Sequence, residues 1–255
     1  MKSLLVLTQP WPRVERLADQ LWQADIPNLA IPFSTIEPRF DQPLMLQSFD
    51  WVVVVSPSAA ERLLALAQAY DPDLPMPRFA CVGPGSVSTL KEGLQSLAWP
   101  DPEIVWPEDN HDAEHLMAAD FWGDLNNQSV LVARATKTKT PWGAMFQERR
   151  ASVKEAGLYE QITLEPDWEF AVPRLKRFIA DPNFEKIVWY ISQEGVAERL
   201  AHAVRNLSIG HVTQRDLALV PHLRIKNLLS RLGWAQIEVV EPGADGLVSV
   251  MRASG

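Results

Sequence analysis

The sequence lacks several features that mark other classes of protein. Its single cysteine, Cys81, cannot form an internal disulfide, which fits a reducing compartment. No apolar run approaches the roughly 18 residues that a membrane-spanning helix needs. The apolar segment 4–7 is also too short to be the core of a secretion signal. We therefore expect a soluble, cytoplasmic protein with no membrane partner.

Positive charge is scarce as well. The 255 residues include 24 Lys and Arg against 32 Asp and Glu, which gives a net charge of −8. A protein that binds nucleic acid needs a basic surface, so we expect no such partner, although a local basic pocket remains compatible with this balance. With 47 % hydrophobic and 22 % charged residues, the composition is that of a globular protein of one or two domains.

Motifs of common cofactors and nucleophiles are missing. The turn 83–86 reads Gly-Pro-Gly-Ser, but a dinucleotide-binding motif would need glycine at position 88, which is Ser88. Ser56 and Ser192 each follow an apolar run without the Gly-x-Ser-x-Gly pattern of a serine nucleophile. These serines are better explained as helix N-caps whose hydroxyls can also bind a ligand.

Histidine and cysteine predict no metal site. His111 and His115 are four residues apart, but Asp112 replaces the expected glutamate and no third ligand is evident. A solvated helix start explains this segment, and Cys81 is expected to be a small buried hydrophobe.

Short apolar runs alternate with helical patterns along the whole chain. Continuous apolar strands separated by amphipathic helices are typical of parallel sheets covered on both faces, so we predict an α/β fold. The predicted strands are 4–7, 51–55, 79–82, 130–133, 187–191, 217–220 and 237–240. The predicted helices are 13–24, 59–70, one to residue 92, one to about 150, one to about 204, 225–232 and one from 244.

Two parts of the chain are alike. Segments 52–63 and 188–200 both read strand, serine, helix, and Gly93 and Gly233 both stand where a helix is expected to end. This predicts two similar α/β units. The alternative, that all strand-helix units look alike, stays open.

Two extended segments indicate that one unit is inserted in the other. We predict a discontinuous domain of residues 1–33 and 165–255, an inserted domain of 38–157, and linker strands 34–37 and 158–164. Clefts between domains are preferred ligand sites. Tyr159, in the second linker, either faces that cleft or packs the linker strand.

Basic residues gather after one predicted strand. The segment 134–140 holds six cationic or hydroxyl side chains, among them Arg134, Lys137 and Lys139, and Arg13 follows another strand. Such a loop suits a polyanionic organic ligand, and a solvated loop is the alternative. Backbone N–H groups of the turn 83–86 can bind an anion at a helix start.

Taken together, these motifs resemble the uroporphyrinogen-III synthase family. They occur in family order across nearly the whole chain, and their order and spacing carry the resemblance. The matching segments are LLVLTQP at 4–10, VVVVSPSAA at 52–60, ACVGPGS at 80–86, VLVAR at 130–134, LYE at 158–160, VPHLRI at 220–225 and LGW at 232–234.

The resemblance implies two flavodoxin-like parallel-sheet domains joined by a two-stranded linker, and a lyase that uses no cofactor and no metal. The expected substrate is hydroxymethylbilane, a linear tetrapyrrole with eight carboxylates. Loss of its terminal hydroxyl leaves an azafulvene, and a spiro intermediate then inverts ring D to give uroporphyrinogen III. We also expect a monomer that makes transient contact with the preceding enzyme of the pathway.

The resemblance also assigns roles to residues. Tyr159 matches a tyrosine proposed to assist departure of the hydroxyl, Ser86 matches a substrate-binding threonine, and Ser56 matches the serine of the Ser-Pro motif. The full set expected to bind substrate is Ser56, Ser58, Gly83, Gly85, Ser86, Arg13, Arg134, Lys137, Lys139 and Ser192.

Three departures keep alternatives open. Gln9 replaces a family arginine, the loop after Arg134 is not glycine-rich, and Arg150 replaces the glycine of an Arg-Gly-Ala motif. A non-catalytic tetrapyrrole-binding or regulatory homologue is therefore the main alternative. A two-domain binding protein for a small anion and a flavin protein of flavodoxin type are weaker ones.

Overall fold

The chain folds into two α/β units. The structure is a computed structural model that describes residues 2–108, 111–138, 140–206 and 215–253. Unit 1 comprises Met1–Thr35 and Ile162–Gly255, and unit 2 comprises Ile36–Gln161. The chain leaves unit 1 within β3 (Ser34–Pro38) and returns to it within β8 (Ser152–Thr163). The predicted fold class, two parallel-sheet units with one inserted in the other, is confirmed.

Unit 1 contains a five-stranded sheet in the order β11-β10-β9-β1-β2, in which every pair is parallel. Numbered within the unit, this is the flavodoxin-like order 2-1-3-4-5, read from the opposite edge. The strands are β1 (Lys2–Leu7), β2 (Asn28–Ala30), β9 (Phe184–Tyr190), β10 (Leu217–Val220) and β11 (Gln236–Val239).

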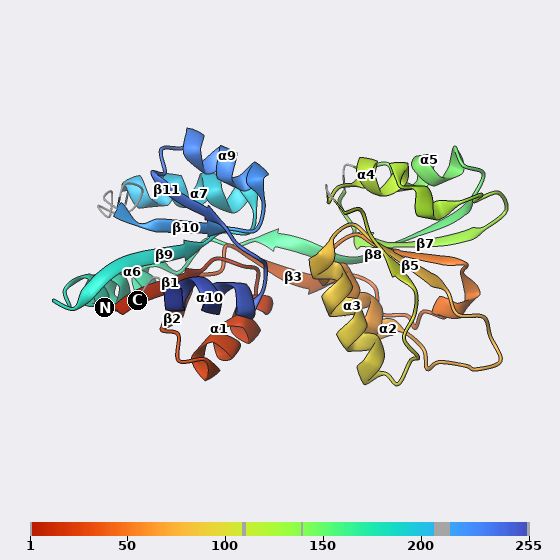
Figure 1. The fold of residues 1–255 in the computed structure, drawn as a ribbon, viewed down its shortest axis with the longest axis horizontal. Helices are drawn as coiled ribbons and strands as arrows, with labels where there is room; N and C mark the ends of the chain where they lie inside the picture. The colour runs from red at the N-terminus through yellow and green to blue at the C-terminus, as the bar shows by residue number, and fades with distance from the viewer. Residues whose placement is uncertain (1, 109–110, 139, 207–214, 254–255) are drawn as a thin grey trace. The chain divides into compact units, whose positions relative to one another are not determined.

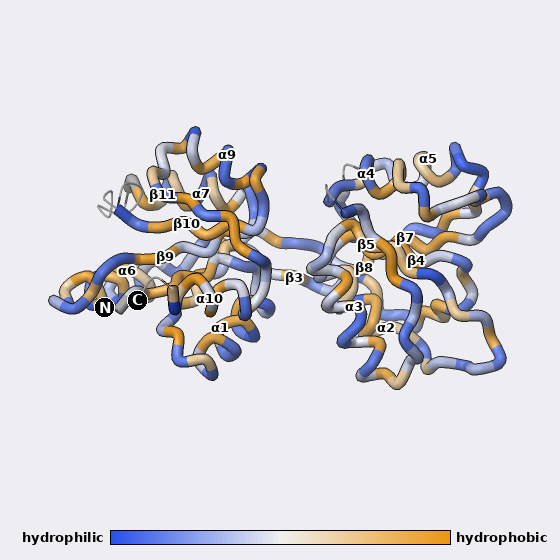
Figure 2. Tube along the Cα trace, viewed as in Figure 1, coloured by the Kyte–Doolittle hydropathy of each residue, from blue (hydrophilic) through white to orange (hydrophobic). Residues whose placement is uncertain are grey.

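Helices cover both faces of this sheet (Figure 1). Helices α6 (Trp168–Ile179), α7 (Glu194–Asn206) and α9 (Leu223–Arg231) pack on one face. Helices α1 (Arg13–Gln23) and α10 (Ala244–Ala253) pack on the other. The central strands β1, β9 and β10 contain residues buried on both sides of the sheet, which explains their continuous apolar runs, visible as orange segments in Figure 2. The edge strands β2 and β11 are only partly buried or exposed.

Unit 2 contains a six-stranded sheet in the order β3-β8-β7-β4-β5-β6. Its remaining strands are β4 (Trp51–Val54), β5 (Arg78–Cys81), β6 (Ile104–Val105) and β7 (Ser129–Ala135), with a short 3-10 helix η1 (Leu46–Ser48) before β4. One face is covered by α2 (Pro57–Leu66) and α3 (Pro84–Ser96). The other is covered by α4 (Ala113–Ala118), η2 (Asp120–Trp122) and α5 (Trp142–Gln147) (Figure 1).

The two sheets are related by a circular permutation. Strands β8-β7-β4-β5-β6 of unit 2 stand in the same spatial order as β2-β1-β9-β10-β11 of unit 1. The pair β7–β8, which comes last in unit 2, therefore corresponds to β1–β2, which comes first in unit 1. Segment β4–α2 of unit 2 therefore corresponds to segment β9–α7 of unit 1, and these are the two segments whose sequences are alike.

Several sequence-based expectations are corrected. Gly93 does not end a helix, since α3 continues to Ser96, and a Cβ on Gly93 would lie 2.2 Å from Leu64 Cδ1. Because Gly93 has no side chain, α3 can pack closely against Leu64 of α2. Gly233 does follow α9, with a φ of +93° that favours glycine. Helix α4 begins at Ala113 with Asp112 as its N-cap, in the segment where a solvated helix start was predicted. Helix α6 was not predicted, because its internal proline, Pro173, weakens the helical pattern.

A buried carboxyl group lies beside the amino end of β10. Asp216 is 5 % exposed and accepts hydrogen bonds from Ile187 N and Trp189 Nε1, both at 3.3 Å. Burial raises the pKa of Asp216 to about 6, against the opposing effect of these hydrogen bonds and of Arg215. Between about pH 4 and 6 the folded protein therefore favours the neutral acid at Asp216, whereas the unfolded chain favours the carboxylate.

This predicts a loss of stability as the pH rises from about 4 to 7. The pKa of Asp216 is higher in the folded protein than in the unfolded chain, so the protonated side chain stabilises the fold fully below about pH 4. This contribution, about 2–3 kcal/mol in unfolding free energy, is lost as the pH rises through the folded pKa of about 6. Urea unfolding of the wild type and Asp216→Asn across this range measures it. The difference between the two unfolding free energies should change with pH in favour of the variant. Parallel pH profiles for both proteins would contradict the prediction.

Candidate functional site

The candidate site is the carboxyl edge of the sheet in unit 2. Since β4, β5 and β7 are parallel, the segments that follow them all leave at this edge. Ser56 follows β4, Gly83 follows β5, and Thr136 and Lys137 follow β7. The chain turns to α2 on one face after β4 and to α5 on the other after β7. Such a topological switch point is where open α/β sheets bind ligands.

A pair of hydroxyl groups lies at this edge. Ser56 Oγ is 2.9 Å from the Tyr159 hydroxyl, and either atom can be the donor. Ser56 is the N-cap of α2 and accepts a hydrogen bond of 3.1 Å from Ala59 N, as predicted. Pro57 at the first helical position needs no N–H partner, so the sequence Ser-Pro suits a helix start. The helix start and the tyrosine are thus joined through one serine.

A β-bulge directs Tyr159 toward Ser56. The register between β7 and β8 moves from Arg134↔Gly157 to Ala135↔Tyr159, so β8 contains one extra residue, Leu158. Leu158 and Tyr159 are consecutive, yet both pack in the cluster that α2 and α3 form with the sheet. Without the bulge, alternation along the strand would place them on opposite faces. Tyr159 is 7 % exposed.

Close contact between β7 and β8 supports this bulge. Thr136 N donates a 2.7 Å hydrogen bond to Tyr159 O, and a Cβ on Gly157 would lie 3.2 Å from both Cα and Cγ2 of Thr136. Neither Thr136 nor Gly157 is among the residues that the sequence predicts for the site. A glycine inside a strand pattern is a signal for a bulge or a close backbone approach, and Gly157 carried that signal.

The glycine turn lies beside the start of α2. Gly83 is the N-cap of α3 and Pro84 follows it, so Ser86 lies inside the first turn of the helix. A Cβ on Gly85 would lie 3.5 Å from Pro57 Cγ, which brings the first turns of α2 and α3 together. Ser58 and Ser86 lie within those first turns, and both are buried.

Arg134 lies on the opposite face of the sheet. Along β7, Leu131 and Ala133 pack with Tyr159, whereas Val130 and Val132 pack with α5. Arg134 follows the second set. Its guanidinium pairs with Glu155, which also accepts from Gly143 N of α5 at 2.9 Å. The structure therefore does not bring Arg134 together with Tyr159.

Lys137 is paired with a carboxylate. Its ammonium contacts Glu160, which also accepts from Arg39 Nε at 3.0 Å, and the Lys137 side chain is 83 % exposed. The hydrogen bond from Lys137 and, to a lesser extent, that from Arg39 hold the pKa of Glu160 below its usual value. Lys137 and Arg39 thus share one carboxylate partner, Glu160, which was not among the site residues predicted from the sequence. Lys139 lies outside the described residues.

The two remaining predicted residues belong to unit 1. Arg13 begins α1 near Tyr190, whose pKa burial raises to about 12 while the charge of Arg13 acts in the other direction. Ser192 follows β9, and α7 begins only at Glu194, so Ser192 stands one residue before the N-cap position and the predicted cap is not formed there. Thr8 Oγ1 donates a 2.8 Å hydrogen bond to Tyr190 O, which joins the carboxyl ends of β1 and β9 in the unit 1 sheet.

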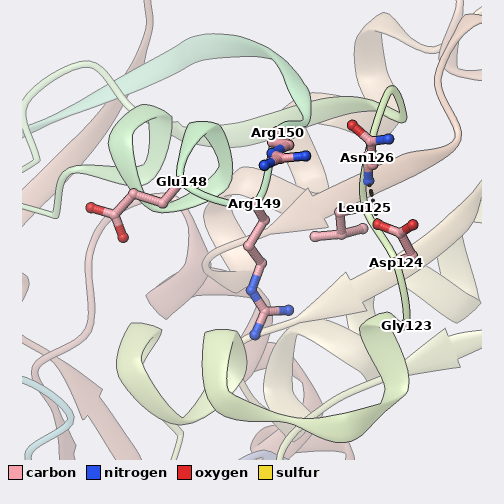
Figure 3. A pocket seen from close by; sticks show the side chains of 7 residues that line it. All are labelled: Gly123, Asp124, Leu125, Asn126, Glu148, Arg149 and Arg150. Atoms are coloured by element: carbon pink, nitrogen blue, oxygen red, sulfur yellow. Dashed lines mark hydrogen bonds between the residues drawn. The ribbon is translucent and has the colours of Figure 1, made fainter.

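A hollow of about 400 Å³ lies at the other end of the unit 2 sheet, before β7 and after α5 (Figure 3). Arg149 donates a 2.7 Å hydrogen bond from Nη2 to Met117 O, and Asp124 Oδ1 accepts from Asn126 N. Arg150 has a φ of +62°, the left-handed region that favours glycine, so the glycine of the expected Arg-Gly-Ala motif would suit this backbone conformation. This hollow is distinct from the edge that holds Tyr159.

Other candidate chemistry is structural. Cys81 is buried within β5, and burial raises the pKa of its thiol to about 12. Asp112 caps α4 and lies 2.7 Å from His115 Nδ1. In the described ranges, no three His, Cys, Asp or Glu side chains are grouped to hold a metal ion. Over the same ranges, none of the helices has the length and apolar character of a membrane span.

Comparison with known proteins gives the family. The profile described as "Uroporphyrinogen-III synthase HemD" matches residues 15–248. The chain belongs to this family. Its fold is similar to that of uroporphyrinogen-III synthetase from Helicobacter pylori, with a TM-score of 0.51, 14 % identity and 100 % of both chains covered. A mutant uroporphyrinogen III synthase from Thermus thermophilus is similar too, with a TM-score of 0.50, 14 % identity and 99 % of each chain covered.

The bulge generates a prediction at this edge of the family fold. Gly157→Ala should push β7 from β8 near Thr136 and weaken the hydrogen bond from Thr136 N to Tyr159 O. We expect a loss of about 1 kcal/mol in unfolding free energy and faster amide exchange at Thr136. Gly195→Ala, in the first turn of α7 with no atom within 4 Å of its Cβ, is the control and should not be destabilising. Unchanged protection of the Thr136 amide would refute the role of Gly157.

Proposed function

We propose that the protein converts hydroxymethylbilane to uroporphyrinogen III, the reaction for which its family is named. The observation that supports this most strongly is the hydrogen bond between Tyr159 and Ser56 at the carboxyl edge of unit 2, in a chain that matches the family over residues 15–248. A weak acid at a switch point is the one catalytic group that this reaction requires.

The chemistry needs little beyond that acid. The terminal C–O bond of the substrate breaks as the pyrrole nitrogen supplies electrons, and Tyr159 delivers its proton to the departing oxygen, which leaves as water. The substituted carbon of ring D then attacks the electrophilic methylene carbon of the azafulvene, and the resulting spiro intermediate opens and recloses with ring D inverted. The protein must hold the chain in the geometry for this closure and disfavour direct closure to the I isomer.

The substrate carboxylates are proposed to bind at helix starts and cations. In unit 2 the backbone of Gly83 and Gly85 and the first turns of α2 and α3, with Ser56, Ser58 and Ser86, supply N–H and hydroxyl donors. Because Ser58 and Ser86 are buried, we propose that the neighbouring backbone N–H groups make most of these contacts. The proposed cations are Lys137 and Lys139 here and Arg13 in unit 1, where Ser192 is a further donor. Arg134 is the weakest member of the proposed set, since Glu155 already occupies it.

A non-catalytic tetrapyrrole-binding homologue is the second candidate. Two observations favour it: Gln9 replaces the arginine of the resembled family, and Lys137 is neutralised by Glu160. Such a protein would keep the fold and bind the linear tetrapyrrole without turnover.

A cytoplasmic location, a monomeric state and transient contact with the enzyme that produces the substrate complete the main proposal.

The isomer ratio tests the function. Without enzyme, hydroxymethylbilane closes directly and slowly to the I isomer. The protein should therefore raise the ratio of uroporphyrinogen III to uroporphyrinogen I over a protein-free control. Tyr159→Phe should lower the rate by about tenfold to a hundredfold, within the range for one acid-base group.

Tyr70→Phe is the matched control, because Tyr70 packs against Trp99 and lies outside the proposed site. It should retain full activity. Binding of the tetrapyrrole without any excess of the III isomer would establish the non-catalytic alternative, and full activity in Tyr159→Phe would remove the proposed role of that residue.

A further inference from the structure

The Ser56 hydroxyl has two partners with different chemistry. It accepts the N–H of Ala59 at 3.1 Å and lies 2.9 Å from the Tyr159 hydroxyl. One oxygen lone pair is therefore used by the first turn of α2, and the hydroxyl proton stays available to Tyr159. Serine can both donate and accept, so it can serve a tyrosine in either protonation state.

The position of this serine also carries the field of a helix. Helix α2 has 10 residues, and its N-terminus is the positive end of its dipole. An Oγ atom that accepts an N–H bond at this end is polarised and becomes a better donor. A negative charge that develops on the Tyr159 oxygen would thus be stabilised through Ser56.

The same arrangement is not repeated in unit 1. Strand β2, the counterpart of β8, consists of Asn28, Leu29 and Ala30 and offers no hydroxyl. Its partner β1 pairs with it in one continuous register, Leu5↔Asn28 to Leu7↔Ala30, without a bulge. Ser192, the counterpart of Ser56, therefore receives no tyrosine from β2. The bulge at this point of the sheet and the tyrosine that it directs have no counterpart in the β1–β2 pair.

We propose that Ser56 is a positioning residue that acts through Tyr159, holding its hydroxyl in line and donating a hydrogen bond to its oxygen as the proton leaves. This inference rests on the proposed function. When the terminal C–O bond breaks, the Tyr159 proton departs as part of water, and Ser56 O–H turns to the phenolate oxygen. Ring D loses its own ring-carbon proton when the macrocycle finally closes, and this proton returns to the Tyr159 oxygen. No other reactant is therefore needed. This role through Tyr159 is separate from the carboxylate binding proposed for Ser56 above, since loss of a carboxylate contact would change KM, whereas loss of the hydrogen bond to Tyr159 would change kcat.

Substitutions at one position separate this role from helix capping. Ser56→Thr keeps both the cap and the donor and should retain activity within about threefold. Ser56→Ala removes both and should lower kcat by about tenfold with little change in KM. Ser56→Asp keeps the cap, because Asp is as good an N-cap as Ser, but it cannot donate to a phenolate. Its kcat should fall at least as far as that of Ser56→Ala.

Two comparisons make the result decisive. Asp167→Ala removes the N-cap of α6, whose side chain accepts from Phe170 N at 2.9 Å, and should leave kcat unchanged. Ser56→Ala should cause no further loss of kcat when added to Tyr159→Phe, because residues that act as a unit are not additive. An active Ser56→Asp, an effect on KM alone, or a full additional loss in the Tyr159→Phe background would overturn the proposal.

A spectroscopic measurement separates this proposal from the proposed function. The chain has three tyrosines, so fluorotyrosine labelling gives a simple fluorine NMR spectrum, and Tyr159→Phe assigns one resonance. Ser56→Ala should shift that resonance and leave those of Tyr70 and Tyr190 in place, whether or not the protein turns over hydroxymethylbilane. An unmoved Tyr159 resonance would overturn the positioning role whether or not the protein turns over substrate. Absence of uroporphyrinogen III from the wild type, with a shifted resonance, would overturn the proposed function and the catalytic step, and would leave only the hydrogen bond between Ser56 and Tyr159.

Discussion

Parallel strand pairing is the constraint on which the site of this protein depends. Because β4, β5, β7 and β8 run in one direction, residues far apart in the chain end at a common edge. Ser56 and Tyr159 are 103 positions apart, yet their hydroxyls are within hydrogen-bonding distance there. Helix starts are gathered at the same edge, since each parallel strand must be followed by a crossover. The fold thus supplies N–H donors for anions before any side chain is considered.

The bulge in β8 adds what regular pairing cannot. An unbroken strand alternates its side chains, so it could present either Leu158 or Tyr159 to the face covered by α2. One extra residue lets Leu158 fill the core while Tyr159 reaches the cap of α2. Gly157 permits this because no Cβ separates it from Thr136. A packing feature therefore sets the direction of the one weak acid in the proposed reaction.

Charge at this edge is balanced locally. Glu160 follows Tyr159 and pairs with Lys137 and Arg39, while Glu155 pairs with Arg134 on the other face. A chain of net charge −8 does not attract an octa-anionic substrate over a long range. Recognition of such a substrate would depend on backbone N–H groups and short-range hydrogen bonds, which lose less of their strength to solvent screening where the site is dry.

The sequence by itself determined the α/β class, the likeness of the two units and most strands, because continuous apolar runs are what sheets covered on both faces require. It also indicated the Ser56 cap and the left-handed turn at Gly233, which are local features of backbone chemistry. It misjudged Gly93, whose role depends on Leu64 in another helix, and it overlooked α6, whose Pro173 weakens the local signal. Only the tertiary structure decided that Arg134 and Tyr159 lie on opposite faces and that Lys137 is paired. The face that a strand residue joins and the ion pairs between distant segments are properties of register and packing, and local patterns do not encode them. For the bulge, the local sequence offers only the signal of Gly157 within a strand.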